Sequence, residues 1–261
     1  NYERRFIMTF PNETLPKGRK QKTTALYDRF VSKGAVMGDS FGLENVLWFA
    51  NNKEDAHEEP TIKRSRSHDY VSKEVQTVRE NVGAIEVANF SKHEFKGPDA
   101  RKFLDHILAG KLPKQGRISL SPMLTYRGKL YGDLTVAGFD EIVFMIFGSG
   151  AAQEMHRRWF ENHISKFNVK YTNKSDDFHG ISIAGPKSRK LLQKLVREDI
   201  ANNNFKFRDT KQMFVAGLPA IVNRISFTGE LGYEIYVAPH FQLKLYEEIE
   251  SAGKEFSLKP F

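Results

Sequence analysis

The sequence predicts an α+β fold of antiparallel sheets with flanking helices. Strand-like segments occur as hairpins, with the clearest one at Arg117–Leu124 and Leu130–Ala137 around a turn at Tyr126-Arg127-Gly128-Lys129. Helical patterns such as Ala151–Phe167 fall between hairpins and do not alternate with single strands. One strand–Gly-Pro–helix arrangement occurs twice. These observations argue against a doubly wound parallel sheet.

The composition is that of a globular protein large enough for one large or two modest domains. The 261 residues are 40% hydrophobic and 12% aromatic. The absence of cysteine excludes disulfides, thiolate catalysis and cysteine-ligated metals. It agrees with a reducing compartment, so we expect a cytoplasmic protein. No apolar run approaches the roughly 18 residues that span a bilayer, and we expect no membrane partner.

The net charge of +8 suggests an acidic partner or a solvated basic surface. The densest basic segment, residues 63–66, lies beside the acids Glu58, Glu59 and Asp69. No zinc finger, basic zipper or aromatic RNA-binding motif accompanies it, so we expect no nucleic-acid partner. A small polyanionic ligand fits this charge better.

The repeated arrangement is Lys96-Gly97-Pro98, followed by a helical pattern, and Ala184-Gly185-Pro186, followed by another. The two glycines are 88 positions apart. Glycine allows a sharp reversal, and proline suits a first helical turn. The repeat predicts two related α+β units; a common turn used twice by chance is the alternative. We expect an N-terminal arm and linker region over 1–69, a first unit over 70–168 and a second over 169–261.

Further elements follow from periodicity and end signals. We expect an extended arm over residues 1–24, loop over most of 51–69, and a helix over Tyr70–Asn81 with Ser72 as a possible N-cap. Additional helices are expected at Ala25–Lys33 and Phe241–Ser251, and additional strands at Glu141–Phe147, Val169–Thr172, Gly180–Ile183, Gln212–Val215, Ala220–Phe227 and Gly232–Val237.

Three acids lie inside strand-like segments: Glu86, Asp133 and Glu234. Burying a carboxylate without partners is unfavourable, because desolvation favours its neutral form. Each acid therefore either faces solvent or points into a pocket where a ligand or neighbour pairs with it. Strand acids near hairpin ends can converge on a cleft and serve acid–base chemistry. The residues alone leave both interpretations open, and leave the role of Glu86 undefined.

Metal and nucleotide sites are weakly supported. The eight histidines show no His-Glu-x-x-His spacing, and His156 and His163, seven apart on one helix, lack a third ligand, so no metal site is expected. The segment Gly148-Ser149-Gly150-Ala151 follows a strand and opens a helix, like half of a dinucleotide-binding loop, but no acidic residue closes a following parallel strand. It suits a turn that offers N–H groups to a ligand.

Three motifs in order resemble the glycine-cleavage T-protein (aminomethyltransferase) family: residues 128–136, with Gly128-Lys-Leu-Tyr-Gly-Asp133; Ile183-Ala-Gly-Pro186; and Phe227-Thr-Gly-Glu-Leu-Gly-Tyr-Glu234. Residues 27–30 and 41–50 and Gly148-Ser-Gly-Ala are similar to the folate-binding C-terminal portion of bacterial dimethylglycine and sarcosine dehydrogenases. The resemblance covers essentially the whole chain. It implies a T-protein-like folate-binding fold.

The resemblance also implies a tetrahydrofolate site. Asp133 would be the catalytic acid beside the reactive nitrogens, stabilising a cationic iminium or managing protons. Glu234 would accept two hydrogen bonds from the pterin. Phe227, Ser149 and Tyr233 are the other expected folate-binding residues. The implied activity is capture of a one-carbon unit from an oxidised N-methyl amine, of the dimethylglycine or sarcosine type, as methylene-tetrahydrofolate.

The chain departs from the family pattern at several places. Phe227 replaces a tyrosine, Ser149 an asparagine, and Gly132 the first of two acids before a leucine. We expect two domains to be absent from this chain: an FAD-dependent dehydrogenase domain and the C-terminal β domain. The dehydrogenase domain would be a partner in the same parent polypeptide, and it alone would hold FAD. The alternative function is therefore a folate-binding or structural module without catalytic activity in this truncated form.

Overall fold

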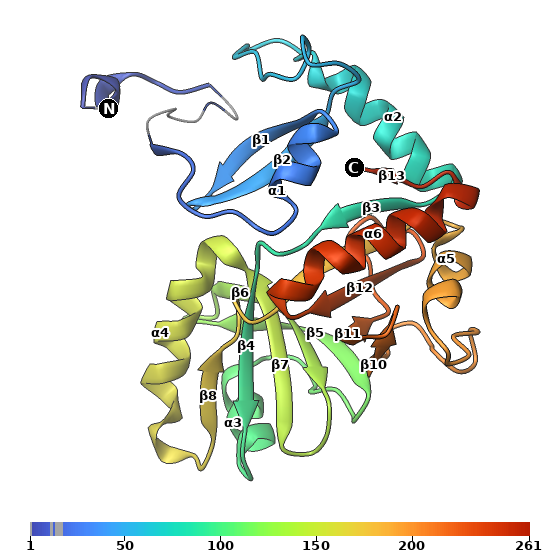
Figure 1. Ribbon diagram of the computed structural model, residues 1–261. Coiled ribbons are helices and arrows are strands. Elements are labelled where there is room, and N and C mark those ends of the chain that lie inside the picture. The colour runs from blue at the N-terminus through green and yellow to red at the C-terminus, as the bar shows by residue number, and fades with distance from the viewer. Residues whose placement is uncertain (1, 11–12, 14–17) are drawn as a thin grey trace.

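The computed structural model describes residues 2–10, 13 and 18–261 (Figure 1). Within these residues, strands form a two-stranded hairpin, a six-stranded sheet and a five-stranded sheet. Part of the extended arm predicted over residues 1–24 falls on residues 1, 11–12 and 14–17, which lie outside the described residues. No described helix is both long and apolar enough to cross a membrane.

The helices and strands alternate irregularly along the chain, as expected for an α+β fold. The helices are α1 (Tyr27–Ser32), α2 (Ser67–Glu80), α3 (Ala100–Ile107), α4 (Gln153–His163), α5 (Ser188–Leu195) and α6 (Gln242–Gly253), with short 3₁₀ turns η1 (Glu3–Phe6), η3 (Gly150–Ala152), η4 (Ile164–Lys166), η5 (Pro239–Phe241) and η6 (Lys254–Phe256). The strands are β1 (Ala35–Ser40), β2 (Leu43–Phe49), β3 (Gly83–Glu86), β4 (Phe90–Lys96), β5 (Arg117–Leu124), β6 (Leu130–Gly138), β7 (Val143–Ser149), β8 (Lys170–Asn173), β9 (His179–Ala184), β10 (Thr210–Val215), β11 (Leu218–Asn223), β12 (Gly232–Val237) and β13 (Lys259–Pro260).

The two larger sheets have the same strand order, which confirms two related α+β units. The five-stranded sheet runs β5-β6-β7-β4-β8, and the six-stranded sheet runs β10-β11-β12-β9-β3 with β13 added beside β3. With the predicted units 70–168 and 169–261, the first strand of each unit lies in the sheet of the other, because β3 pairs with β9 and β8 pairs with β4. The units are therefore interlocked by the exchange of one strand each.

The two Gly-Pro turns hold the exchanged strands in place. Gly97 and Gly185 have φ of +148° and +128°, conformations that glycine adopts more readily than other residues. A Cβ on Gly97 would lie 2.6 Å from the carbonyl oxygen of Asn168, and one on Gly185 would lie 2.5 Å from that of Asn81. Asn168 precedes β8 and Asn81 precedes β3. Each turn therefore packs directly against the backbone that leads into the exchanged strand.

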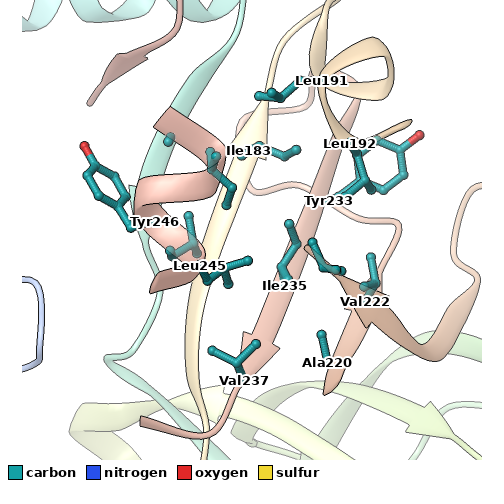
Figure 2. Close-up of a cluster of buried hydrophobic side chains, with 14 of the residues drawn as sticks. Ile183, Leu191, Leu192, Ala220, Val222, Tyr233, Ile235, Val237, Leu245 and Tyr246 are labelled. Atoms are coloured by element: carbon teal, nitrogen blue, oxygen red, sulfur yellow. The ribbon is translucent and has the colours of Figure 1, made fainter. Parts of the chain in front are cut away.

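Strand alternation sorts the apolar side chains into separate layers. Tyr233 and Ile235 of β12 pack toward α5 and α6 in the largest cluster, part of which Figure 2 shows. Phe144 and Ile146 of β7 likewise pack with α3 and α4. The opposite faces of the two sheets meet in a third cluster, in which the rings of Phe147 and Tyr236 lie 4.8 Å apart. The order of layers is helices, sheet, sheet, helices.

The N-terminal hairpin β1–β2 and α1 lie over the six-stranded sheet near β3 (Figure 1). Leu26 and Phe30 of this segment belong to the largest cluster. The helix predicted over Tyr70–Asn81 begins at Ser67, so Ser72 lies inside α2 and is not its N-cap. Strand β1 was not expected from the sequence, because Gly38 and Asp39 interrupt its apolar pattern.

The division into 1–69, 70–168 and 169–261 stays a prediction. The range 1–69 contains the hairpin β1–β2. Each larger sheet draws one strand from the other predicted unit, namely β3 or β8.

We predict that Gly185→Ala destabilises the protein by about 3 kcal/mol, because a strained φ and a backbone clash add together. Gly128→Ala is the matched control, since Gly128 has a φ of +70° but no atom within 4 Å of its Cβ position. The control should lose only about 1 kcal/mol. Urea denaturation of both variants measures the difference. Equal losses would contradict the proposed role of the close backbone contact.

Candidate functional site

Four of the five predicted site residues line one cavity of about 520 Å³ at the end of the inter-sheet layer: Asp133, Ser149, Phe227 and Glu234. They come from β6, the end of β7, the β11–β12 loop and β12. These elements belong to both units, so the cavity requires both sheets. Its volume falls within the range of small-molecule sites.

Glu234 is the buried acid of this cavity, with 9% of its surface exposed. It shares the inter-sheet face of β12 with Tyr236, whose hydroxyl donates a 2.9 Å hydrogen bond to Glu234 Oε2. Burial raises the pKa of Glu234 to about 7, while Tyr236, the Asn223 amide and the Lys92 charge oppose this rise. The carboxylate therefore accepts hydrogen bonds from N–H groups most readily at and above neutral pH.

Tyr233 lies on the other side of the same strand and does not line the cavity. Its ring packs in the helix-facing cluster beside Leu192, as Figure 2 shows, and its hydroxyl accepts a 3.1 Å hydrogen bond from Arg189 Nε. Successive strand residues point to opposite faces, so Tyr236, not Tyr233, accompanies Glu234. The alternation in Gly232–Val237 would have identified Tyr236 from the sequence.

Asp133 is exposed, unlike Glu234. It lies opposite Pro122 in the β5–β6 register, while its neighbour Leu134 points into the core. Of the two interpretations left open for the strand acids, Asp133 therefore combines both, since it faces solvent and lines the cavity. The cavity joins a solvent-accessible carboxylate on one sheet to a buried carboxylate on the other.

The third strand acid, Glu86, lines a second cavity of about 300 Å³ that shares Glu234, Phe227, Phe90 and Asn89 with the first. Gln242 Nε2 donates a 2.5 Å hydrogen bond to Glu86 Oε1. Burial raises the pKa of Glu86 to about 7, and hydrogen bonds from Thr24 and Gln242 oppose this. The second cavity is thus lined by two desolvated carboxylates, Glu86 and Glu234, and Glu234 also lines the first cavity.

Phe227 and Ser149 lie at the exposed edge of the first cavity. The Phe227 side chain is 92% exposed, and Ser149 ends β7 opposite Phe90.

Among the described residues no group of three or more metal-ligating side chains occurs. His163 instead bonds the Trp159 carbonyl and the Tyr126 hydroxyl, and His156 is buried behind Gly132 and Gly148.

The chain is similar in sequence to two groups of named proteins. It is 36% identical to mouse dimethylglycine dehydrogenase, mitochondrial, over 98% of this chain and 30% of that protein. It is 30% identical to the aminomethyltransferase of Thermoanaerobacter pseudethanolicus over 72% of this chain and 51% of that protein. The chain thus spans less than a third of the length of the dimethylglycine dehydrogenases that it matches.

Solved structures share the fold. The glycine cleavage system aminomethyltransferase T of Bartonella henselae superposes with a TM-score of 0.74 at 20% identity, over 92% of this chain and 59% of that chain. A chain of the heterotetrameric sarcosine oxidase from Corynebacterium sp. U-96 superposes with a TM-score of 0.57 at 16% identity, over 76% of this chain and 97% of that chain. The expected T-protein-like α+β fold is confirmed.

The GCVT N-terminal domain family matches residues 26–261, which include both units and every residue of the cavity. Together with the identity to the dimethylglycine dehydrogenases and aminomethyltransferases, this match decides the assignment. The chain belongs to the GCVT N-terminal domain family.

Proposed function

We propose that this chain binds tetrahydrofolate in the larger cavity and transfers to it a one-carbon unit from an oxidised N-methyl amine of the dimethylglycine or sarcosine type. The observation that carries the proposal is the meeting of Asp133 and Glu234 in one cavity. Membership in an aminomethyltransferase-type family and similarity to dimethylglycine dehydrogenases support it. Methylene-tetrahydrofolate would be the product.

Glu234 would recognise the pterin. A pterin presents a ring N–H and an exocyclic amine side by side, and one ionised carboxylate can accept from both. The hydrogen bond from the Tyr236 hydroxyl to Glu234 Oε2 fixes the orientation of the Glu234 carboxylate. Phe90 and Phe227 supply apolar lining for a flat ring, and Ser149 supplies a polar group at the exposed edge.

Asp133 would act on the one-carbon donor. When bound, tetrahydrofolate supplies the nucleophilic nitrogen of the reaction. The exposed Asp133 carboxylate can attract a cationic iminium electrostatically and take up a proton released during transfer. Because Asp133 keeps contact with solvent, it can then return this proton to water.

The oxidation that creates the donor belongs to the proposed parent. We propose that an FAD-dependent dehydrogenase domain elsewhere in a longer polypeptide supplies the oxidised amine, consistent with the chain's 30% share of its dehydrogenase relatives. A cytoplasmic location remains part of the proposal on the strength of the cysteine-free sequence, although the mouse relative is named mitochondrial. The alternative is a module that binds folate but does not transfer the one-carbon unit from the donor to it.

We predict that Glu234→Gln weakens tetrahydrofolate binding about 30-fold at pH 8, because the amide presents an N–H group to a ligand donor. Wild-type binding should strengthen as pH rises through about 7, since the carboxylate must be ionised to accept both hydrogen bonds. Anaerobic calorimetric titration between pH 6 and 8.5 measures both effects. Glu247→Gln, on the exposed face of α6, is the control. A wild-type chain that is folded but gives no heat with tetrahydrofolate would refute the proposed function.

We predict that Asp133→Asn leaves tetrahydrofolate affinity within about twofold and slows one-carbon transfer about 100-fold. The donor is generated in the same solution by a separate flavin dehydrogenase acting on dimethylglycine, and methylene-tetrahydrofolate is quantified against a reaction without the chain. Equal rates for both proteins would exclude a catalytic role for Asp133. Folate binding without any wild-type acceleration would favour the non-catalytic module.

A further inference from the structure

Lys92 of β4 is a buried lysine that the proposed function does not use. Its side chain is 0% exposed, and Nζ donates a 2.9 Å hydrogen bond to the carbonyl oxygen of Ala88. Transferring an ammonium group into a protein interior is strongly unfavourable unless opposite charge compensates it. Burial accordingly lowers the pKa of Lys92 to about 7.

The duplicated fold does not require a lysine at this position. Lys92 lies five residues before Gly97, and the residue five before Gly185 is Gly180. Lys92 is paired with Phe147, and Gly180 is paired with Tyr236 in the equivalent register. The second unit therefore forms the equivalent strand with a glycine, which has no side chain, at the position of Lys92. A reason for Lys92 must come from its surroundings.

The acids that attract the Lys92 charge are the exposed Asp176 and the two buried carboxylates of the site, Glu86 and Glu234. Lys92 Nζ lies 5.7 Å from the centre of the Tyr236 ring, and the Tyr236 hydroxyl is bonded to Glu234. Both Glu86 and Glu234 attract the Lys92 charge, and Lys92 in turn lowers the pKa of each. The charge of one buried lysine thus favours ionisation of two desolvated carboxylates.

Asp176 attracts the Lys92 charge more strongly than either glutamate does. However, Asp176 is exposed and forms an ion pair with Lys22, whose charge opposes that of Lys92. The neighbouring imidazoles of His93 and His179 are kept neutral because burial lowers the pKa of each. Tyr236 stays a hydroxyl donor, since burial raises its pKa.

We propose that Lys92 is a positioning residue whose buried amino group, when protonated, favours the ionised forms of Glu234 and Glu86, so that Glu234 faces the cavity as a hydrogen-bond acceptor. Without Lys92, two like charges would remain in a region of low dielectric, and one would be neutralised by a proton. A protonated Glu234 would present an O–H to the ligand and could not accept two N–H bonds. The consequence for folate rests on the proposed function; the electrostatic role does not.

The ionisation of the two carboxylates tests the inference without any ligand. Side-chain carboxyl ¹³C shifts of glutamate are followed by NMR titration, with Glu86→Gln and Glu234→Gln used for assignment. Lys92→Met, which keeps a long chain without charge, should raise both titration midpoints by about one pH unit, equivalent to a tenfold change in proton affinity. Lys102→Met, an exposed lysine of α3, is the charge-matched control and should leave both midpoints unchanged. Unchanged midpoints in Lys92→Met would overturn the proposal.

A reciprocal measurement covers the case in which Lys92→Met does not fold. Coupling between two titrating groups acts on both, so Glu234→Gln should lower the titration midpoint of the Lys92 ammonium. Lysine ¹⁵Nζ NMR on this variant measures the shift. A Lys92 midpoint equal to that of the wild type would show that the groups are not coupled.

Tetrahydrofolate binding distinguishes a positioning role from a packing role. Lys92→Met should move the pH midpoint of binding upward by about one unit and recover wild-type affinity near pH 9. Affinity lowered equally at every pH would identify a packing defect and contradict the proposal. A wild-type chain that does not bind tetrahydrofolate would refute the proposed function, while the carboxyl titrations would still decide the role of Lys92.

Discussion

The close backbone contact at the two Gly-Pro turns determines how the rest of the structure is arranged. Each turn leaves room only for glycine against the segment that leads into an exchanged strand. Because β3 and β8 are fixed in this way in the sheet of the other unit, neither unit has a complete sheet alone. The exchange holds the two sheets face to face, and the inter-sheet face is where the cavity opens.

Strand alternation then divides that face between core and site. The tilted rings of Phe147 and Tyr236 pack against each other across the two sheets. Glu234 lies two residues before Tyr236 on the same face of β12, and it lines the cavity. Tyr236 contributes its ring to the apolar contact and its hydroxyl to the carboxylate, so it joins both regions. A change at Tyr236 would therefore affect packing and ligand recognition together, whereas a change at Glu234 acts mainly on the site.

Much of this arrangement could be predicted from the sequence where short-range chemistry decides it. Strands Arg117–Leu124 and Gly232–Val237, the turn at Gly128 and both Gly-Pro devices follow from local residue types. The exchange of β3 and β8 could not be predicted, because it is a choice of long-range pairing between strands of similar character. Strand alternation, read along Gly232–Val237, puts Tyr233 on the helix-facing side of β12 and Tyr236 on the side of Glu234. The exposure of Asp133 depends on neighbouring elements, so the sequence left open whether this acid faces solvent.

The two acids of the cavity occupy opposite environments, and this contrast is the chemical content of the site. Glu234 is desolvated and sensitive to every nearby charge, which suits selective recognition of paired N–H groups. Asp133 is exposed, so water can exchange protons with it. Burying Asp133 as well would add a second desolvated carboxylate to the cavity that Glu234 lines, whereas Lys92 already attracts both Glu86 and Glu234. Because Asp133 is exposed, the buried negative charge among the described residues of the two cavities is limited to Glu86 and Glu234. Protonated Lys92 balances part of this charge, and a bound cationic one-carbon donor would balance more of it.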